Sequence, residues 1–199
     1  MIHPQTELAY ISDEIGYGVV ATSLLKKGTI TWVLDKLDRE FTPIQVHELE
    51  PIFQDILEKY SFRNNRGNHV LCWDNARFVN HSFKSNCLTT AYDFEIAIRD
   101  IQPGEQLTDD YGYLNVSTPF EALDEGTRRK TVYPDDLLRY AHIWDRQLLS
   151  AFRVLPKVEQ KLRPLLGDDL WQRSLDIASG NLRMDSIRTC FYQPDNKEQ

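Results

Sequence analysis

Residues 75–87 read NARFVNHSFKSNC and concentrate polar side chains in an unusual way. Asparagine, histidine, serine, arginine and lysine are interleaved there with Phe78, Val79 and Phe83, as if the segment were held in an interior. Polar side chains that are buried must find hydrogen-bond partners. The segment is therefore either a rigid polar network or a loop that contacts a ligand, and the residues alone leave both interpretations open.

Two more segments combine glycines with residues that could face a ligand. Residues 15–19, IGYGV, place Gly16 and Gly18 on either side of Tyr17, ahead of a β-favouring run. Glycine permits positive φ and a close approach of the backbone, so main-chain groups could hold a ligand here, although a tight turn is the simpler interpretation. Residues 103–113, PGEQLTDDYGY, predict a turn and a short strand that leads to two acids and a tyrosine.

The pattern of apolar residues changes near residue 115. Before it, turn residues separate four β-favouring runs, at 18–22, 29–34, 70–73 and 94–98. A helical pattern at 42–60 interrupts these runs, and Pro51 predicts its break into two short helices. After residue 115, a polar linker to residue 131 precedes three segments with helical spacing, at 134–155, 158–167 and 171–182.

Composition is that of a folded soluble protein. The chain has 199 residues, of which 41% are hydrophobic and 27% charged, and three cysteines without a CxxC pair. It therefore predicts neither a disulfide framework nor a metal site. No apolar run approaches the roughly 20 residues that cross a bilayer. The first residues lack the basic and apolar regions of a signal peptide, so a cytoplasmic location and no membrane partner are expected.

The net charge of −7 is unevenly distributed. Residues 1–114 hold 10 basic and 17 acidic side chains, a net of −7, whereas residues 115–199 hold 13 of each and balance. An acidic surface repels phosphate backbones and attracts cationic partners. The distribution disfavours nucleic acid as a direct ligand and favours a basic protein or peptide, with an ordinary solubility charge as the alternative interpretation.

Taken together, in this order and at this spacing, the segments resemble those of the SET-domain protein lysine methyltransferases. Residues 16–18 resemble the family's GxG element, and residues 26–30, KKGTI, its following turn. Residues 77–82, RFVNHS, match the RFxNHS motif, and residues 104–112, GEQLTDDYG, match the GEELxxDYG motif. The resemblance covers about residues 10–114.

The resemblance implies an α+β, β-rich SET fold of small curved sheets with a C-terminal pseudoknot. The SET domain would occupy residues 1–114, with a variable helical insert at about residues 36–66. An α-helical C-terminal extension at residues 115–199 would replace the zinc-binding segment that follows the domain in many members. The helices of this extension could also pair two chains in a homodimer.

The family binds S-adenosylmethionine in one pocket and a lysine side chain in another, and a narrow channel joins them. S-adenosylhomocysteine is the product. Tyr111 would be the catalytic tyrosine at the site of transfer. By position, the cofactor-binding residues would be Gly16, Tyr17, Gly18, Asn80, His81 and Tyr111. Because the pKa of a tyrosine is about 10, Tyr111 is a poor general base, and its expected role is electrostatic.

Several channel positions depart from the family's pattern. Asp109 stands where many members carry an aromatic residue, Leu34 where many have a channel tyrosine, and Thr89 where some place the aromatic residue that limits methylation. Fewer aromatic residues would widen the channel. The candidates to line it instead are Tyr60, Trp73, Tyr92 and Tyr113, with core packing as the alternative for each.

The leading interpretation is an S-adenosylmethionine-dependent, metal-free protein lysine N-methyltransferase that acts on a basic protein, histone-like or other. One alternative is a SET-like module that binds basic tails with little or no transfer. The other is a methyltransferase for a small-molecule amine. Without a zinc segment, the C-terminal tail would close the cofactor site with an aromatic residue, for which the candidates are Trp144, Phe191 and Tyr192. A nuclear location, or delivery into a host cell, would suit the same function.

Overall fold

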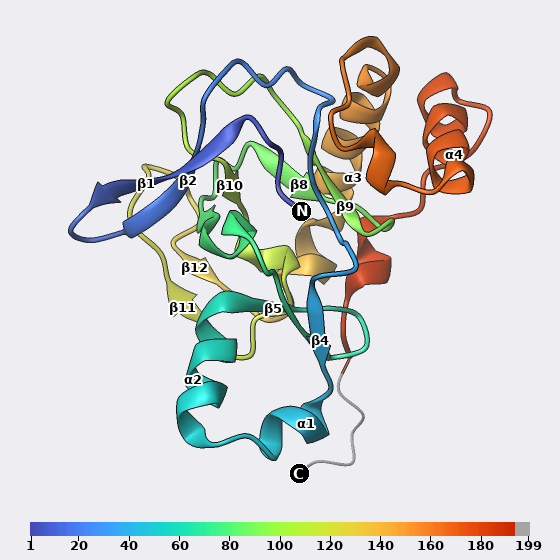
Figure 1. Cartoon of the computed structure of the whole chain (residues 1–199). Coiled ribbons are helices and arrows are strands. Elements are labelled where there is room, and N and C mark those ends of the chain that lie inside the picture. The colour runs from blue at the N-terminus through green and yellow to red at the C-terminus, as the bar shows by residue number, and fades with distance from the viewer. Residues whose placement is uncertain (194–199) are drawn as a thin grey trace.

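The computed structural model describes residues 1–193 and shows a mixed fold of short strands and helices (Figure 1). Strands β1 and β2 form an antiparallel hairpin, and three-stranded antiparallel sheets have the orders β3-β9-β8 and β4-β6-β5. The strands of these sheets are β1 (Thr6–Ser12), β2 (Gly16–Ala21), β3 (Ile30–Val33), β4 (Arg39–Phe41), β5 (Ser61–Arg63), β6 (His69–Leu71), β8 (Cys87–Thr89) and β9 (Phe94–Ala97).

Two smaller pairs of strands complete the β structure. Strands β7 (Asn80–His81) and β10 (Thr108–Asp109) pair in parallel, and β11 (Phe120–Glu121) and β12 (Thr131–Val132) form a hairpin. The parallel pair joins the two polar segments singled out in the sequence. The hairpin lies in the stretch for which the sequence predicts a linker, because strands of two residues leave no periodicity to read.

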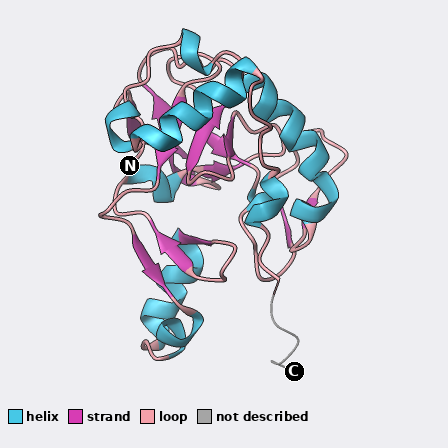
Figure 2. Ribbon diagram, turned by 90° about the vertical axis from the view of Figure 1, so that its right-hand side faces the viewer, coloured by secondary structure: helices cyan, strands magenta, loops and turns pink. Residues whose placement is uncertain are grey.

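The helical pattern at 42–60 divides at Pro51, as predicted. Helix α1 (Pro43–His47) begins with a capping box, in which the side chains of Thr42 and Gln45 each bond the other residue's backbone. Helix α2 (Pro51–Tyr60) begins with Pro51 in its first turn, where a missing N–H costs nothing. Figures 1 and 2 place both helices and sheet β4-β6-β5 at one end of the molecule.

The C-terminal helices are α3 (Asp136–Phe152) and α4 (Asp168–Ser179). Gly180, with φ of 82°, ends α4 in the left-handed conformation that glycine adopts without strain. The predicted helix at 158–167 is wrong: only 3₁₀ turns form, at Leu155–Lys157 and Arg163–Leu165, because a proline in each prevents a regular helix. No helix among the described residues is both long and apolar enough to cross a bilayer.

Helix α3 shares one hydrophobic core with the β3-β9-β8 sheet. Phe152 is fully buried, and its ring lies 5.9 Å from that of Phe94 on β9. Trp144 lies edge-on to Tyr113, with ring centroids 5.3 Å apart. A second cluster, which includes Val19, Leu107 and Ala97, packs between β2 and the other face of the sheet. The residues after 114 are thus structurally continuous with those before, while threading as a pseudoknot stays a prediction.

This shared core predicts a single cooperative unfolding transition. Phe152→Ala should lower the free energy of unfolding by about 3–5 kcal/mol, because it leaves a cavity beneath the sheet. Phe53→Ala, on an exposed face of α2, should change it by less than about 0.5 kcal/mol. Urea titrations followed by circular dichroism measure both values. Two separate transitions in the wild-type protein would show that the C-terminal helices fold apart from the sheet.

Candidate active site

The two polar segments meet in the parallel pair β7–β10. Asn80 is the register partner of Thr108, and His81 that of Asp109. The backbone N–H of Ser82 extends the ladder by donating to the carbonyl of Asp109 at 2.8 Å. Strand β10 leads directly into the 3₁₀ turn Tyr111–Tyr113, so this pairing brings the tyrosine beside the Asn-His strand.

Tyr111 is held at both ends. Its backbone N–H donates to Nδ1 of His81 at 3.1 Å, and its phenol donates to the carbonyl of Val79 at 2.7 Å. Burial, reinforced by nearby Asp109 and Glu95, raises the pKa of the phenol well above its ordinary value near 10. Tyr111 is therefore a neutral, fixed phenol and not a proton acceptor.

His81 presents an unused donor. Because its Nδ1 accepts from Tyr111, a neutral ring carries its proton on Nε2, and burial lowers the pKa of this histidine. The Nε2 atom is buried and has no hydrogen-bond partner within residues 1–193. The rings of Phe83 and Phe120 lie edge-on to the imidazole, with centroids 4.5 and 5.8 Å away. Buried polar atoms are normally satisfied, so this one points to a missing ligand or water.

The glycine pair lies against the same strand. The side-chain amide of Asn80 donates to the carbonyl of Tyr17 at 3.1 Å and to Oε1 of Gln106 at 3.0 Å. A Cβ on Gly18 would come within 2.6 Å of both side chains, so only glycine fits there. Gly16 has a φ of 79°, whereas the side chain of Tyr17 is exposed. Contacts thus link Tyr17 and Gly18 to Asn80, and His81 to Tyr111, whereas Gly16 pairs with Ser12 in the β1–β2 hairpin.

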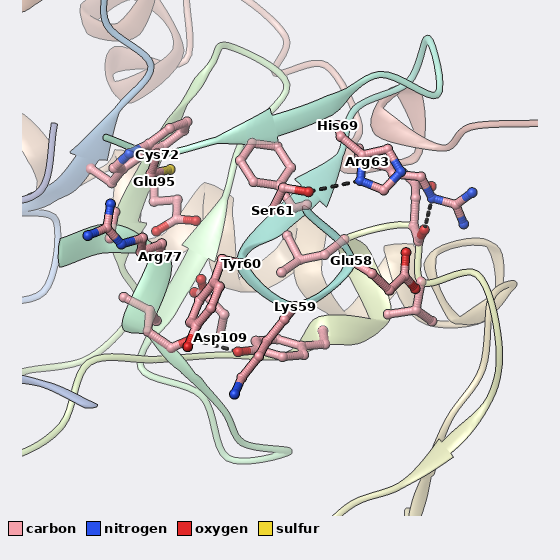
Figure 3. Close-up of a pocket in the computed structure, with 18 of the residues that line it drawn as sticks. Glu58, Lys59, Tyr60, Ser61, Arg63, His69, Cys72, Arg77, Glu95 and Asp109 are labelled. Carbon is pink, nitrogen blue, oxygen red and sulfur yellow. Dashed lines mark hydrogen bonds between the residues drawn. The ribbon is translucent and has the colours of Figure 1, made fainter. Parts of the chain in front are cut away.

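Tyr111 also lines a cavity of about 290 Å³. Figure 3 shows this cavity, with Glu58, Tyr60, Glu95 and Asp109 among the residues labelled around it. Its inner wall includes Tyr111, Val79 and Asp109, and its outer wall is formed by the end of α2, strand β5 and residues 114–118. Its aromatic lining residues are Trp32, Tyr60, Phe62, Tyr111 and Phe120. Tyr60 is among the candidates from the sequence, whereas Trp32, Phe62 and Phe120 were not.

The two other tyrosines proposed for the channel lie in the core and do not line this cavity. Tyr113 is 1% exposed, and its phenol bonds Oδ1 of Asp109 at 2.8 Å and the carbonyl of Cys87 at 3.2 Å. The phenol oxygen of Tyr92 accepts from the backbone N–H of Asp185 at 2.7 Å. Both rings serve packing, the alternative that the sequence left open, because they point toward α3.

An arginine fixes the segment that follows the site. Arg129 forms ion pairs with Asp110, next to Tyr111, and with Asp136 at the start of α3. Its guanidinium is stacked between the rings of Phe83 and Tyr140, 4.5 and 4.4 Å from their centroids. Arg129 lies in the loop between β11 and β12, so its contacts hold the hairpin that carries Phe120 to His81.

Among residues 115–193, the aromatic side chain beside His81 is thus Phe120 and none of the three candidates from the tail. Trp144 is buried against Tyr113, and Tyr192 lies over Gly67 and 5.7 Å from the Arg63 guanidinium. Phe191 packs at the edge of the main core. Within residues 1–193, no group of three histidine, cysteine or acidic side chains is placed to bind a metal ion.

Comparison with known proteins agrees with this geometry. The SET domain family model matches residues 16–112, which contain the glycine pair, the Asn-His strand and Tyr111. A search of the curated proteins found no match to the chain. SET domains are generally methyltransferases. The motifs, the geometry that joins them and the family match identify this chain as a SET-domain protein.

Proposed function

We propose that the chain is an S-adenosylmethionine-dependent protein lysine N-methyltransferase. The observation that carries the proposal is the position of Tyr111. The backbone N–H of Tyr111 contacts His81, whose Nε2 donor has no partner among the described residues. Tyr111 also lines the cavity. Methyl transfer needs the methyl donor and the acceptor amine to approach in line. An opening at Tyr111 between the cofactor site and the amine site would allow this approach.

The residues present fit the cofactor. Gly18 lets the Asn80 side chain approach the backbone of the glycine pair, and His81 offers a neutral N–H donor in a largely aromatic setting. S-adenosylmethionine, when bound, supplies a methyl group on a cationic sulfonium. The fixed backbone of residues 16–18 and the Asn80-His81 strand would hold it, and Phe120 would cover it.

The acceptor must react as an uncharged amine. A free lysine has a pKa near 10.4 and is almost entirely protonated at pH 7. Entry into the cavity removes water, and the neighbouring sulfonium is a like charge, so both effects would lower the pKa of the amine. The neutral Tyr111 would orient the reacting groups through its oxygen.

The partner proposed is a basic protein or peptide and not a nucleic acid. The net charge of −7 over residues 1–114 supports this choice, because most of the cavity wall comes from that part of the chain. The acidic Glu58 lies at the cavity wall, where its carboxylate accepts from Ser117 at 2.7 Å. Association with a cationic substrate should weaken as salt concentration rises.

Incubation with methyl-labelled S-adenosylmethionine tests the proposal. The purified chain would be mixed with core histones, other basic proteins and poly-L-lysine, and separately with small amines. Label in protein, located on lysine by mass spectrometry, is the expected result. Cofactor binding by calorimetry without any methyl transfer would instead indicate a binding module. Label only in the small amines would indicate a methyltransferase for a small-molecule amine.

Tyr111→Phe should reduce kcat by about 10²–10³-fold, in the range found when one stabilising donor is removed from a transition state. Its affinity for S-adenosylhomocysteine should change little, because the contact from the Tyr111 backbone to His81 remains. Tyr133→Phe, which removes a phenol from an exposed tyrosine outside the site, is the matched control. Full turnover by Tyr111→Phe would remove this residue from its assigned role.

Gly18→Ala should weaken binding of S-adenosylhomocysteine at least tenfold, because the new methyl would displace Asn80 and Gln106. Gly167→Ala introduces the same methyl where no atom lies within 4 Å, and should bind as the wild type does. Isothermal titration calorimetry measures both affinities, with circular dichroism to check folding. Wild-type affinity in folded Gly18→Ala would place the cofactor elsewhere.

A further inference from the structure

Two carboxyl groups lie at the inner wall of the cavity that Tyr111 closes. Glu95 comes from β9 and Asp109 from β10, and both line the cavity (Figure 3). The two carboxyls influence each other's titration, and Asp109 raises the pKa of Glu95. An acidic pair at this position is unexpected in a site that needs only to hold a methylene chain.

The fold gives each acid a distinct position. Phe94 and Ile96 point from β9 into the main core, so the alternation of a strand turns Glu95 to the opposite face, toward the cavity. Glu95 is partly exposed, whereas Asp109 is 5% exposed and is fixed by the Tyr113 phenol at 2.8 Å. Glu95 is therefore the accessible member of the pair, and Asp109 the anchored one.

The pair holds one proton between two acids near neutral pH. Burial is the main cause that raises the pKa of each: that of Asp109 to about 6, and that of Glu95 well above its ordinary value. Glu95, whose pKa is raised by burial and by the neighbouring Asp109, is the member of the pair that favours the proton. The titratable or charged groups that act on the pair from neighbouring elements are Asp110, Tyr111, Tyr113, Cys72, Cys87 and the amino terminus.

Polar atoms without hydrogen-bond partners on the neighbouring strand β3 also indicate a ligand in this cavity. Trp32 is the register partner of Glu95, and Thr31 precedes it on β3. Both line the cavity and are 5% and 1% exposed, yet Nε1 of Trp32 and Oγ1 of Thr31 have no hydrogen-bond partner among the described residues. An unmade hydrogen bond of a buried group costs about 1–3 kcal/mol, so polar atoms in this position suit a polar ligand.

We infer that the Glu95–Asp109 pair accepts the proton of the incoming amine, an inference that rests on the proposed function. The ammonium N–H bond breaks and an O–H bond forms on Asp109, which converts an ammonium and a singly charged pair into a neutral amine and two neutral carboxyls. The amine keeps its lone pair for the methyl group. The added proton then leaves to water through the open side of the cavity, and the pair returns to its singly charged state.

The physical reason is the exclusion of water. In a cavity of low dielectric, two separated opposite charges are less favourable than their neutral products, so transfer from ammonium to carboxylate becomes easier than in water. Burial is what raises the basicity of the Asp109 carboxylate, whereas the neighbouring Glu95 carboxyl acts in the opposite sense by stabilising the charged form. The phenol of Tyr111 is neutral and donates to the carbonyl of Val79, so the acids and not Tyr111 would accept the proton of the amine.

The test is the pH dependence of methyl transfer by the double variant E95Q/D109N, with the acceptor found by labelling. Proton acceptors contribute about 10²–10⁴-fold, so kcat should fall by about 10²-fold or more at pH 7. The defect should shrink toward pH 10, where water itself deprotonates the amine. Glu48→Gln, which removes an exposed carboxylate on the surface, is the control for charge and should match the wild type. A defect of equal size at every pH, or none, would overturn the inference.

Infrared spectroscopy at pH 7 examines the pair without acceptor or cofactor. The wild type should show the C=O stretch of a protonated carboxyl, and E95Q/D109N should lack it. Absence of this band in the wild type would refute the shared proton even if lysine methylation is observed. A chain that carries the band and transfers no methyl group would instead refute the proposed function.

Thermal unfolding of the same variant gives a further prediction. The folded pair binds protons more tightly than the unfolded chain, so its contribution to stability is present below the unfolded pKa near 4 and is lost as pH rises through the folded pKa values. The melting temperature of the wild type relative to E95Q/D109N should therefore fall as the pH rises from about 4 through about 6, where Asp109 titrates. A constant difference across this interval would show that the acids titrate as exposed carboxyls do.

Discussion

The pairing of β7 with β10 is the interaction on which the site depends. Asn86, which is 1% exposed, stabilises this pairing from one side. Its amide donates to the carbonyl of Gln106 at 2.7 Å and accepts from the backbone N–H of Thr108 at 2.9 Å. A buried side chain that satisfies backbone groups of another strand is costly to replace, because each group would lose its partner. Asn86 therefore sets the register that brings Tyr111 to His81.

This register has consequences on both sides of Tyr111. This register leaves Nε2 of His81 without a hydrogen-bond partner among residues 1–193, and it sets the Asn80 side chain against Gly18, where a Cβ would collide with it. Toward α2 it places the phenol and the Asp109 carboxylate at the wall of one cavity. A site for a cation donor and a site for an amine can then share a single boundary.

The sequence predicted the elements that short-range chemistry determines. Pro51 marks the start of α2, as its backbone preference requires, and the Asn80-His81 and Tyr111 motifs meet as their family resemblance implies. It could not tell which aromatic residues line the cavity, because the direction of a ring depends on packing that residue identity does not specify. Tyr92 and Tyr113 point into the core for this reason.

Other features depend on contacts between distant segments. Phe120 reaches His81 on a hairpin too short to give a pattern, and Arg129 fixes that hairpin through acids on either side of residue 115. Glu95 faces the cavity because its neighbours on β9, Phe94 and Ile96, both pack into the hydrophobic core. A polar residue within the apolar run 94–98 was the available signal, and only the sheet shows which face it occupies.

A crystal structure of the chain with S-adenosylhomocysteine tests the central claim most directly. The account predicts the ligand between the strand of Gly18 and the Asn80-His81 strand, bonded to Nε2 of His81, with its sulfur at the boundary that Tyr111 forms with the cavity. Density for the ligand at another surface, or a sulfur atom separated from the cavity by closed protein, would contradict it.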